Sequence, residues 1–265
     1  MTSASQLPAL PAAKVRALSF VSDPNPSIED LLGIVHSDPA LTAGILRAAN
    51  SAASAPVDRI KSAQTAVVRI GAAETRRIVL GIALSGSFGN LQRSGINEDE
   101  LWRHLVATAV LADAIAWGSV EHSSAFTAGL LHDIGRLAMA AQWPDQYSTV
   151  VQLAQRGIPS QEAERMCFGF DHVEHGTAIG DAWGFPEEIV EAIANHHGPS
   201  HRGISWAVIR ARELAGSLGI SDGLVPAVPL EEESEASMLP VIEDLGGESA
   251  VLERVGWYSG ALHAA

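Results

Sequence analysis

A histidine and an aspartate stand side by side inside the apolar segment AGLLHDIGRLA at residues 128–138. They are His132 and Asp133. Burial of a carboxylate is costly unless a metal ion, a counter-charge or hydrogen bonds compensate it. The pair therefore indicates either a bound ion or a charge partner that the fold brings to Asp133.

Further histidines occur on both sides of this pair, about one in each predicted helix. They are His104, His172, His196 and His197. Helical bundles build metal sites from one inward-pointing ligand on each helix. Imidazole and carboxylate together suit iron, manganese or zinc rather than calcium. We therefore predict that these histidines and the His132–Asp133 pair form one cluster of the metal-binding type.

Taken singly, these histidines have structural interpretations as well. His104 could be a core histidine with satisfied hydrogen bonds. His196 and His197 precede Gly198-Pro199, where a histidine suits the negative end of a helix. His175 shares a helical face with His172, but we expect it to face solvent.

Composition limits the classes of protein to be considered. The chain has 265 residues, 47% hydrophobic and 18% charged, enough for a sizeable core. Cys167 is the only cysteine, which excludes an intrachain disulfide and a thiolate zinc cluster. A net charge of −14 argues against non-specific binding to nucleic acid or anionic membranes. The longest apolar window, 105–120, contains Asp113 and is too short to span a membrane. We predict a soluble, cytoplasmic bacterial protein in which the acidic run 231–235 is a solvated loop.

Nearly every segment has the apolar period of an α-helix and no series of strands is recognisable, so the predicted fold class is all-α. Ser27 and Asp38-Pro39 are typical helix starts, and Gly71 separates two helices. The expected helices cover residues 28–36, 39–49, 62–70, 72–84, 98–117, 123–142, 146–155, 160–167, 172–183, 186–196, 204–218 and 248–255.

The segment AGLLHDIGRL resembles the signature of the HD superfamily of metal-dependent phosphohydrolases. The whole pattern is most similar to the regulatory branch of that superfamily, the HDOD (HD-related output domain) family, over about residues 7–218. The matching motifs are LPALP, SDPALTAGILRAANSA, RIVLGIAL, LLHDIGRL, GFDHVEHG, WGFPEEIVEAIANHH and SLG. The resemblance implies an N-terminal helical lobe (1–97) packed on an HD-like helical bundle (98–218). An acidic tail with one short helix (219–265) is expected to follow.

Asn50-Ser51, inside an alanine-rich helix, is especially typical of HDOD proteins. Asparagine is poorly suited to a helix interior, so we assign these two residues a structural role. The amide of Asn50 is expected to satisfy backbone groups where the two lobes meet. The alternative is that the helix ends at Ala49 and Asn50 is its cap.

The resemblance also implies a ligand set, and this chain departs from it. The ligand positions of active relatives match His104, His132, Asp133, His172, His196 and His197. Their final aspartate is replaced by Arg212 and the lysine of the HDIGK motif by Arg136. HHGPSHRG (196–203) lacks the signature of the HD-GYP subfamily. Because two-metal hydrolysis needs bridging carboxylates, we expect a degenerate site without catalytic residues.

We expect Arg212 to replace the cation as partner of Asp133, so that the site is plugged and no cofactor binds. In one alternative, Glu213 turns inward and a single iron, manganese or zinc ion binds, although adjacent helix positions diverge by about 100°. In the other alternative, an active two-metal site persists.

The resemblance implies a non-catalytic signal-transduction or output module that acts through protein–protein contacts in a bacterial regulatory pathway. The pathway is expected to be two-component or linked to cyclic di-GMP, and the partners to be signalling proteins or a second copy of the chain. The alternative is a metal-dependent phosphohydrolase or phosphodiesterase. A DNA-reading helix-turn-helix around Gly71 is disfavoured by the acidic charge. We expect neither a nucleic acid nor a membrane partner.

Overall fold

Helices are the only regular elements in the part of the chain that the computed structural model describes. These residues are 17–18, 20, 23, 26–51, 56, 58–88, 91–116, 122–200, 202–227 and 240–262. No strand occurs in these ranges, so the predicted all-α fold is confirmed. None of the helices in these ranges has the length and apolar character needed to cross a membrane. The LPALP motif and the acidic run 231–235 lie outside the described residues.

The chain divides into two compact units, and each is described by itself. The N-terminal unit comprises Ala9–Ser87 and Leu252–Ala265, and the central unit comprises Met1–Pro8 and Phe88–Val251. The C-terminal segment from Leu252 on therefore groups with the N-terminal unit.

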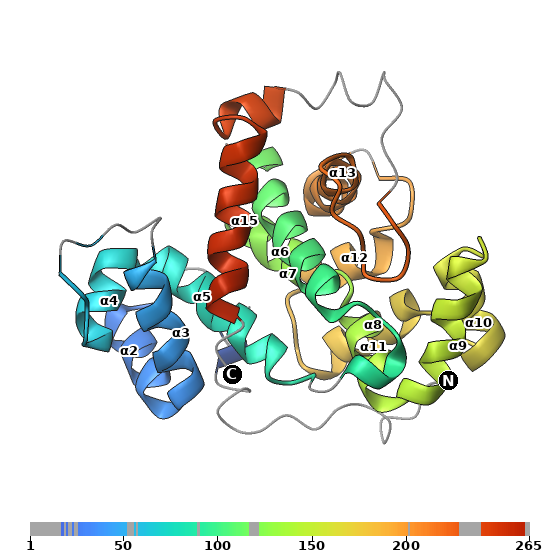
Figure 1. Cartoon of the computed structure of the whole chain (residues 1–265), viewed down its shortest axis with the longest axis horizontal. Coiled ribbons are helices and arrows are strands. Elements are labelled where there is room, and N and C mark those ends of the chain that lie inside the picture. Colours follow the sequence, from blue (N-terminus) through green and yellow to red (C-terminus); the bar gives the residue numbers. More distant parts are fainter. Residues whose placement is uncertain are drawn as a thin grey trace. The chain divides into compact units, whose positions relative to one another are not determined.

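The N-terminal unit contains four described helices before residue 88, and the first two begin at the caps that the sequence predicts. They are α2 (Ile28–Ser37), α3 (Pro39–Asn50), α4 (Ala63–Ile70) and α5 (Ala72–Ser85) (Figure 1). Ser27 Oγ and Asp38 Oδ1 accept hydrogen bonds from the backbone N–H groups of Asp30 and Ala40, at 3.1 and 2.8 Å. Gly71, with φ of +90°, separates α4 from α5 because other residues rarely adopt that conformation.

The C-terminal helix α15 (Glu248–Leu262) is longer than expected, since it continues to Leu262 rather than ending near residue 255. Its buried side chains recur at helical spacing, with Val255, Tyr258 and Leu262 at most 5% exposed. Trp257 Nε1 donates to the carbonyl oxygen of Ala48 at 3.2 Å. A Cβ atom on Gly81 of α5 would lie only 2.5 Å from Leu262 Cδ2. The end of α15 therefore packs closely on α3 and α5.

Asn50 is the last residue of α3, one residue beyond the alternative end at Ala49. Its Nδ2 donates to the carbonyl oxygens of Leu46 and Ile60 at 2.7 and 2.9 Å, and its Oδ1 accepts from Ile60 N at 2.8 Å. Ser51 Oγ donates to the Ala48 carbonyl at 2.9 Å. The amide thus satisfies backbone groups, as predicted. Both partners, Leu46 and Ile60, belong to the N-terminal unit, and the inter-lobe location of Asn50 stays a prediction.

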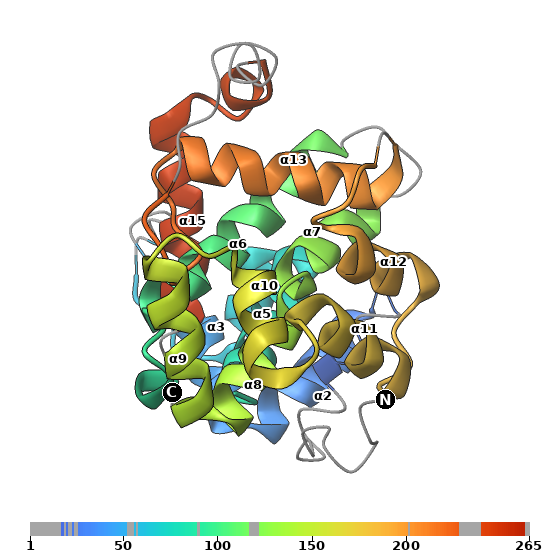
Figure 2. The ribbon, with the colours of Figure 1, turned by 90° about the vertical axis from the view of Figure 1, so that its right-hand side faces the viewer.

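The central unit contains one 3-10 helix and eight α-helices among the described residues. They are η3 (Leu91–Ser94), α6 (Glu98–Ile115), α7 (His122–Leu131), α8 (Ile134–Gln142), α9 (Pro144–Gln155), α10 (Ser160–Phe168), α11 (His172–Ala182), α12 (Glu187–Asn195) and α13 (Gly203–Ser217). Helix α6 packs against α7 and α13, and α11 packs against α8 and α12. Figure 2 shows α13 lying across α6 and α7.

The single helix expected over residues 123–142 is instead two helices, α7 and α8, which are interrupted at His132 and Asp133. A closely packed glycine lies on each side of the interruption. A Cβ atom on Gly129 would lie 2.7 Å from Ala109 Cα, and one on Gly135 would lie 1.9 Å from the His172 carbonyl oxygen. The glycines thus allow α7 to approach α6 and α8 to approach α11, with the His-Asp pair in the turn between them.

Candidate metal centre

The six predicted ligands lie in two groups that share Asp133. One group contains Asp133, His172, His196 and His197, and the other contains His104, His132 and Asp133. Within each group, the candidate donor atoms all lie within 4.8 Å of one another. All of these side chains are buried except that of His197, so the first group has one member that reaches solvent.

Local sequence signals place His172 in this cluster. Asp171, His172, Val173 and Glu174 form a capping box, in which Asp171 Oδ1 accepts from Glu174 N at 3.0 Å and Asp171 N donates to Glu174 Oε2 at 3.3 Å. His172 is therefore the first residue of α11. Arg165 pairs with the buried carboxylate of Asp171 and compensates its charge.

Three of the histidines are held by their Nδ1 atoms. His132 Nδ1 lies 2.7 Å from the Gly129 carbonyl oxygen and His196 Nδ1 lies 2.7 Å from that of Ile193. His172 Nδ1 lies 2.5 Å from Glu164 Oε2. Carbonyl and carboxylate oxygens only accept, so we assign the proton of each ring to Nδ1. Each Nε2 then presents a lone pair, as in histidines that bind metals.

The donor atoms of the first group have the spacing of a metal coordination shell. His172 Nε2 lies 3.2 Å from Asp133 Oδ1, 3.3 Å from His196 Nε2 and 3.0 Å from His197 Nε2. His196 Nε2 lies 3.2 Å from Asp133 Oδ1. Bonds of about 2.0–2.1 Å in a tetrahedral zinc site place neighbouring ligand atoms about 3.3 Å apart. Acceptors at this spacing repel one another unless a cation lies among them.

Several polar atoms of the cluster have no hydrogen-bond partner among the described residues. They are both ring nitrogens of His104 and His132 Nε2. The carboxylate of Asp133 accepts no hydrogen bond there either, although its Oδ2 forms an ion pair with Arg136. Buried polar atoms are rarely left in this state. The donor set consequently fits a transition-metal ion. The residues of the first group, with their four converging donors, are those that would hold it.

Burial keeps the imidazoles neutral, which is the form that binds metals. It lowers the pKa of His104 to about 3, with His132 and Arg212 adding to the effect. It also lowers the pKa of His132 and holds that of His196 well below the usual value. Burial alone would raise the pKa of Asp133, but the charge of Arg136 holds it well below its usual range.

Arg136, not Arg212, is the direct counter-charge of Asp133. Arg136 Nη1 lies 3.0 Å from Asp133 Oδ2 and 3.0 Å from Asp222 Oδ2, and its side chain is fully buried. Its Nη2 donates to Ser160 Oγ at 3.3 Å. Arg136 lies in the first turn of α8, three residues after Asp133, a separation that places two side chains on the same face. The prediction that Arg212 pairs with Asp133 is therefore wrong.

Arg212 instead binds the end of α12. Its Nη1 donates to the His196 carbonyl oxygen at 2.8 Å and lies 3.5 Å from His197 Nδ1. The structure records no ion pair between Arg212 and Asp133 in the described part of the chain. Glu213 pairs with Arg210 at 2.7 Å, and its side chain is 39% exposed. The alternative in which Glu213 turns inward as a ligand is thus wrong as well.

Three residues of the site were not identified from the sequence. They are Glu164, Tyr147 and Asp222. Glu164 Oε2 accepts from the backbone N of His172 at 2.9 Å, and Glu164 Oε1 accepts from Tyr147 Oη at 2.6 Å. Asp222 shares Arg136 with Asp133. An acid eight residues before His172 was a weak signal for Glu164, because its role depends on how α10 folds back on α11. Asp222 follows α13 and gave no local signal.

His175 is fully buried, against the expectation that it faces solvent. Its ring packs on Phe170 and Trp143, with ring centroids 5.5 and 5.7 Å away. Burial lowers its pKa to about 4. His175 therefore belongs to an aromatic cluster beside the metal-type site rather than to the donor set.

We expect Glu164→Gln to weaken zinc binding about 10–100-fold, the effect typical of losing a carboxylate that orients a ligand histidine. Glutamine keeps the size of the side chain but removes the charge that holds the proton on His172 Nδ1. Competition with a chromophoric chelator measures the affinity. Glu162→Gln, at an exposed position of the same helix, is the control. Equal affinities for the two variants would show that Glu164 does not position His172.

The chain is similar to known proteins over most of its length. Residues 7–199 match the model of the HDOD domain. An HDOD domain protein of unknown function from Geobacter sulfurreducens has a similar structure, with a TM-score of 0.73 and 24% identity, covering 95% of this chain and 92% of that one. The MmoQ response regulator of Methylococcus capsulatus has a TM-score of 0.50 and 25% identity, with coverages of 90% and 96%.

A curated relative, an uncharacterized protein of Treponema pallidum (strain Nichols), is 23% identical over 199 residues. The match includes 74% of this chain but only 38% of the relative. The chain therefore spans well under half the length of that protein.

Proposed function

Because the chain belongs to the HDOD domain family, we propose that it is a regulatory module that transmits signals through contacts with other proteins and does not hydrolyse phosphodiesters. The observation that carries this proposal is the position of Arg136 between Asp133 and Asp222, 3.0 Å from an oxygen of each. A fixed positive charge there already neutralises the carboxylate that both groups of donors share.

Electrostatics supports this assignment. Two-metal hydrolysis uses ions about 3.5–4 Å apart, and the second ion would need His104, His132 and Asp133. At about 4 Å from a guanidinium, a divalent ion would be repelled by about 8 kcal/mol at an effective dielectric constant of 20. Arginine cannot relieve this repulsion by losing its proton. The second group is therefore proposed to remain without a metal ion.

The first group is proposed to hold one ion of zinc, iron or manganese. Three carboxylates, of Asp133, Glu164 and Asp222, lie around the cluster with the guanidiniums of Arg136 and Arg212. The excess is one negative charge, which suits one divalent ion better than two. When bound, that ion would supply a Lewis acid and a cross-link. Asp133, His172 and His196 would join the α7–α8 turn, the start of α11 and the end of α12.

The signalling role is supported by the family and by the similarity to the MmoQ response regulator. We extend the proposal to a two-component or cyclic-di-GMP-linked pathway in the bacterial cytoplasm. The proposed partners are signalling proteins or a second copy of the chain.

Metal content and hydrolytic activity test the proposal together. Purified protein dialysed against zinc or manganese is expected to retain close to one ion per chain by elemental analysis. His196→Ala, which removes a donor, is expected to retain close to none. Neither protein should hydrolyse bis(p-nitrophenyl) phosphate.

Two ions per chain together with metal-dependent hydrolysis would overturn the proposal in favour of the phosphohydrolase alternative. Absence of any retained ion would overturn the one-ion site and favour a fully plugged core.

A further inference from the structure

A pocket in the N-terminal unit is lined by three cationic side chains, and no carboxylate is among its described lining residues. The cations are Arg47 from the C-terminal half of α3, and Arg59 and Lys61 from the segment before α4. Leu46, Pro56 and Ile60 supply apolar walls. The cavity measures about 990 Å³, which is at the upper end of the range for small-molecule sites.

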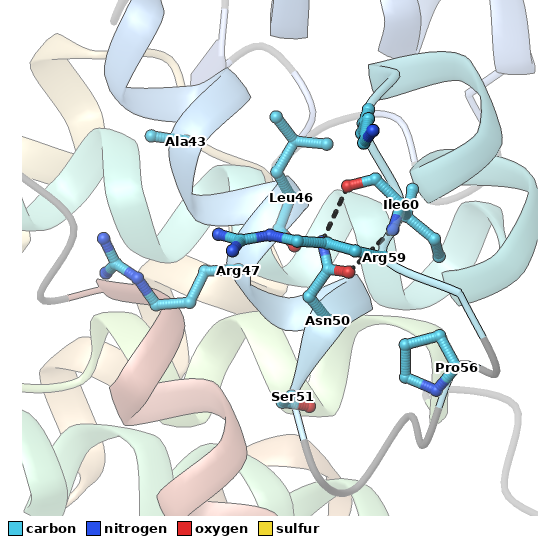
Figure 3. A pocket seen from close by; sticks show the side chains of 9 residues that line it. Ala43, Leu46, Arg47, Asn50, Ser51, Pro56, Arg59 and Ile60 are labelled. Atoms are coloured by element: carbon cyan, nitrogen blue, oxygen red, sulfur yellow. Dashed lines mark hydrogen bonds between the residues drawn. The ribbon is translucent and has the colours of Figure 1, made fainter.

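The pocket has a defined base. Asn50 bridges the end of α3 to Ile60, with two hydrogen bonds to the Ile60 backbone and one to Leu46 O. Figure 3 shows these bonds between the residues that line the pocket, with the long side chain of Arg59 extending across Asn50. The amide of Asn50 therefore fixes the segment that carries Arg59 and Lys61 relative to the helix that carries Arg47.

The three cations are available to a ligand. All three are exposed, and the described part of the chain offers no ion pair to Arg59 or Lys61. Arg47 Nη1 donates to the Gly260 carbonyl oxygen at 3.2 Å, which leaves its other N–H groups. This concentration of positive charge occurs in a chain with a net charge of −14.

The helix dipole explains why a cation occurs at position 47 but not why one occurs at position 61. Arg47 lies in the last turn of α3, where a cation interacts favourably with the helix dipole. Lys61 precedes Ser62, the N-cap of α4, where a positive charge opposes the dipole. Because Lys61 does not stabilise its own helix, a bound anion gives its position a physical reason.

We propose that this pocket binds a phosphorylated small molecule of about nucleotide size. The phosphates lie against Arg47, Arg59 and Lys61, since guanidinium groups bind phosphate oxygens through paired hydrogen bonds. The organic part lies against Leu46, Pro56 and Ile60. The site is separate from the metal-type cluster, because all of its residues belong to the N-terminal unit.

Isothermal titration of the full chain with ATP and with pyrophosphate tests the proposal. EDTA is present so that the metal-type cluster cannot hold the probes through an ion, and the salt is about 0.15 M so that weak surface attraction is screened. ATP is expected to bind, and pyrophosphate to bind more weakly because it lacks an organic part. The double variant Arg59→Glu/Lys61→Glu is expected to weaken ATP binding by about tenfold or more.

Arg156→Glu, an exposed charge reversal in the central unit, is the matched control and should change ATP affinity less than about twofold. Circular dichroism verifies that each variant is folded. The proposal is overturned if ATP does not bind, if the double variant binds it as tightly as the control, or if pyrophosphate binds as tightly as ATP.

Discussion

Arg136→Met, assayed without metal at pH 7, is expected to lower the free energy of unfolding by about 3–5 kcal/mol, the usual cost of removing one partner of a buried ion pair. Methionine fills most of the space but supplies no charge. Asp133, whose side chain is fully buried, then loses its direct counter-charge, and Asp222 loses the same partner. Urea denaturation of the two proteins in EDTA measures the difference.

The sign of the pH dependence identifies the group responsible. In the wild type the pKa of Asp133 lies well below its usual range, so its contribution to stability is present above about pH 4 and is lost at lower pH. In the variant, burial is no longer offset by Arg136 and raises that pKa. Protonation then favours the folded variant, so the difference from the wild type should shrink between pH 8 and pH 5.

Arg212→Met is the matched control for this experiment. It removes a guanidinium that donates to the His196 carbonyl oxygen but makes no recorded ion pair with Asp133. Its loss of stability should be smaller and should not shrink on acidification. Manganese or zinc should stabilise Arg136→Met more than Arg212→Met, because only the former has lost the direct counter-charge of Asp133. A change below about 0.5 kcal/mol for Arg136→Met, the range of ordinary surface substitutions, would contradict the assignment.

Metal-free wild type is expected to lose at least about 2 kcal/mol of unfolding free energy between pH 7 and pH 5 through three buried histidines. Burial lowers the pKa values of His104, His132 and His196, whereas the unfolded chain titrates near pH 6.5. A group with a depressed pKa in the folded state stabilises the fold above its unfolded pKa, and that contribution is lost as the pH falls. His104, whose pKa in the folded protein is about 3, contributes about 2 kcal/mol over this interval, and His132 and His196 add to the loss in the same direction.

Even the contribution of His104 is a substantial part of the total stability of a typical domain, about 5–15 kcal/mol. Urea denaturation at the two pH values in EDTA measures the loss. His104→Leu should recover about 2 kcal/mol of the pH-dependent part, because both ring nitrogens of His104 lack partners. His36→Leu, at an exposed position of α2, should bring no such recovery. Equal stability at pH 7 and pH 5 would mean that these imidazoles are already charged in the folded protein.

Helices, helix ends and the order of the candidate ligands could be predicted from the sequence, because they depend on residues that are close together in the chain. The apolar period of the helices indicated the all-α fold, and Ser27, Asp38 and Gly71 indicated where helices begin or separate. The family followed from the same motifs. The types and order of the candidate ligands were also visible, because each occurs on its own helix. Capping hydrogen bonds and helical faces involve residues three or four positions apart, so they can be predicted from a short stretch of sequence.

Choices among distant partners were decided only by the tertiary structure. The sequence contained two arginines able to neutralise Asp133, and the fold brought Arg136 to it while Arg212 bound the His196 carbonyl. Asp222 meets Arg136 across 86 residues of chain, and Glu164 reaches His172 because α10 ends where α11 begins. The expected helix over residues 123–142 is divided at His132 and Asp133, between two glycines that pack closely on neighbouring helices. Electrostatic and packing energies depend on distances in space, and distances between remote residues leave no periodic signal in the sequence.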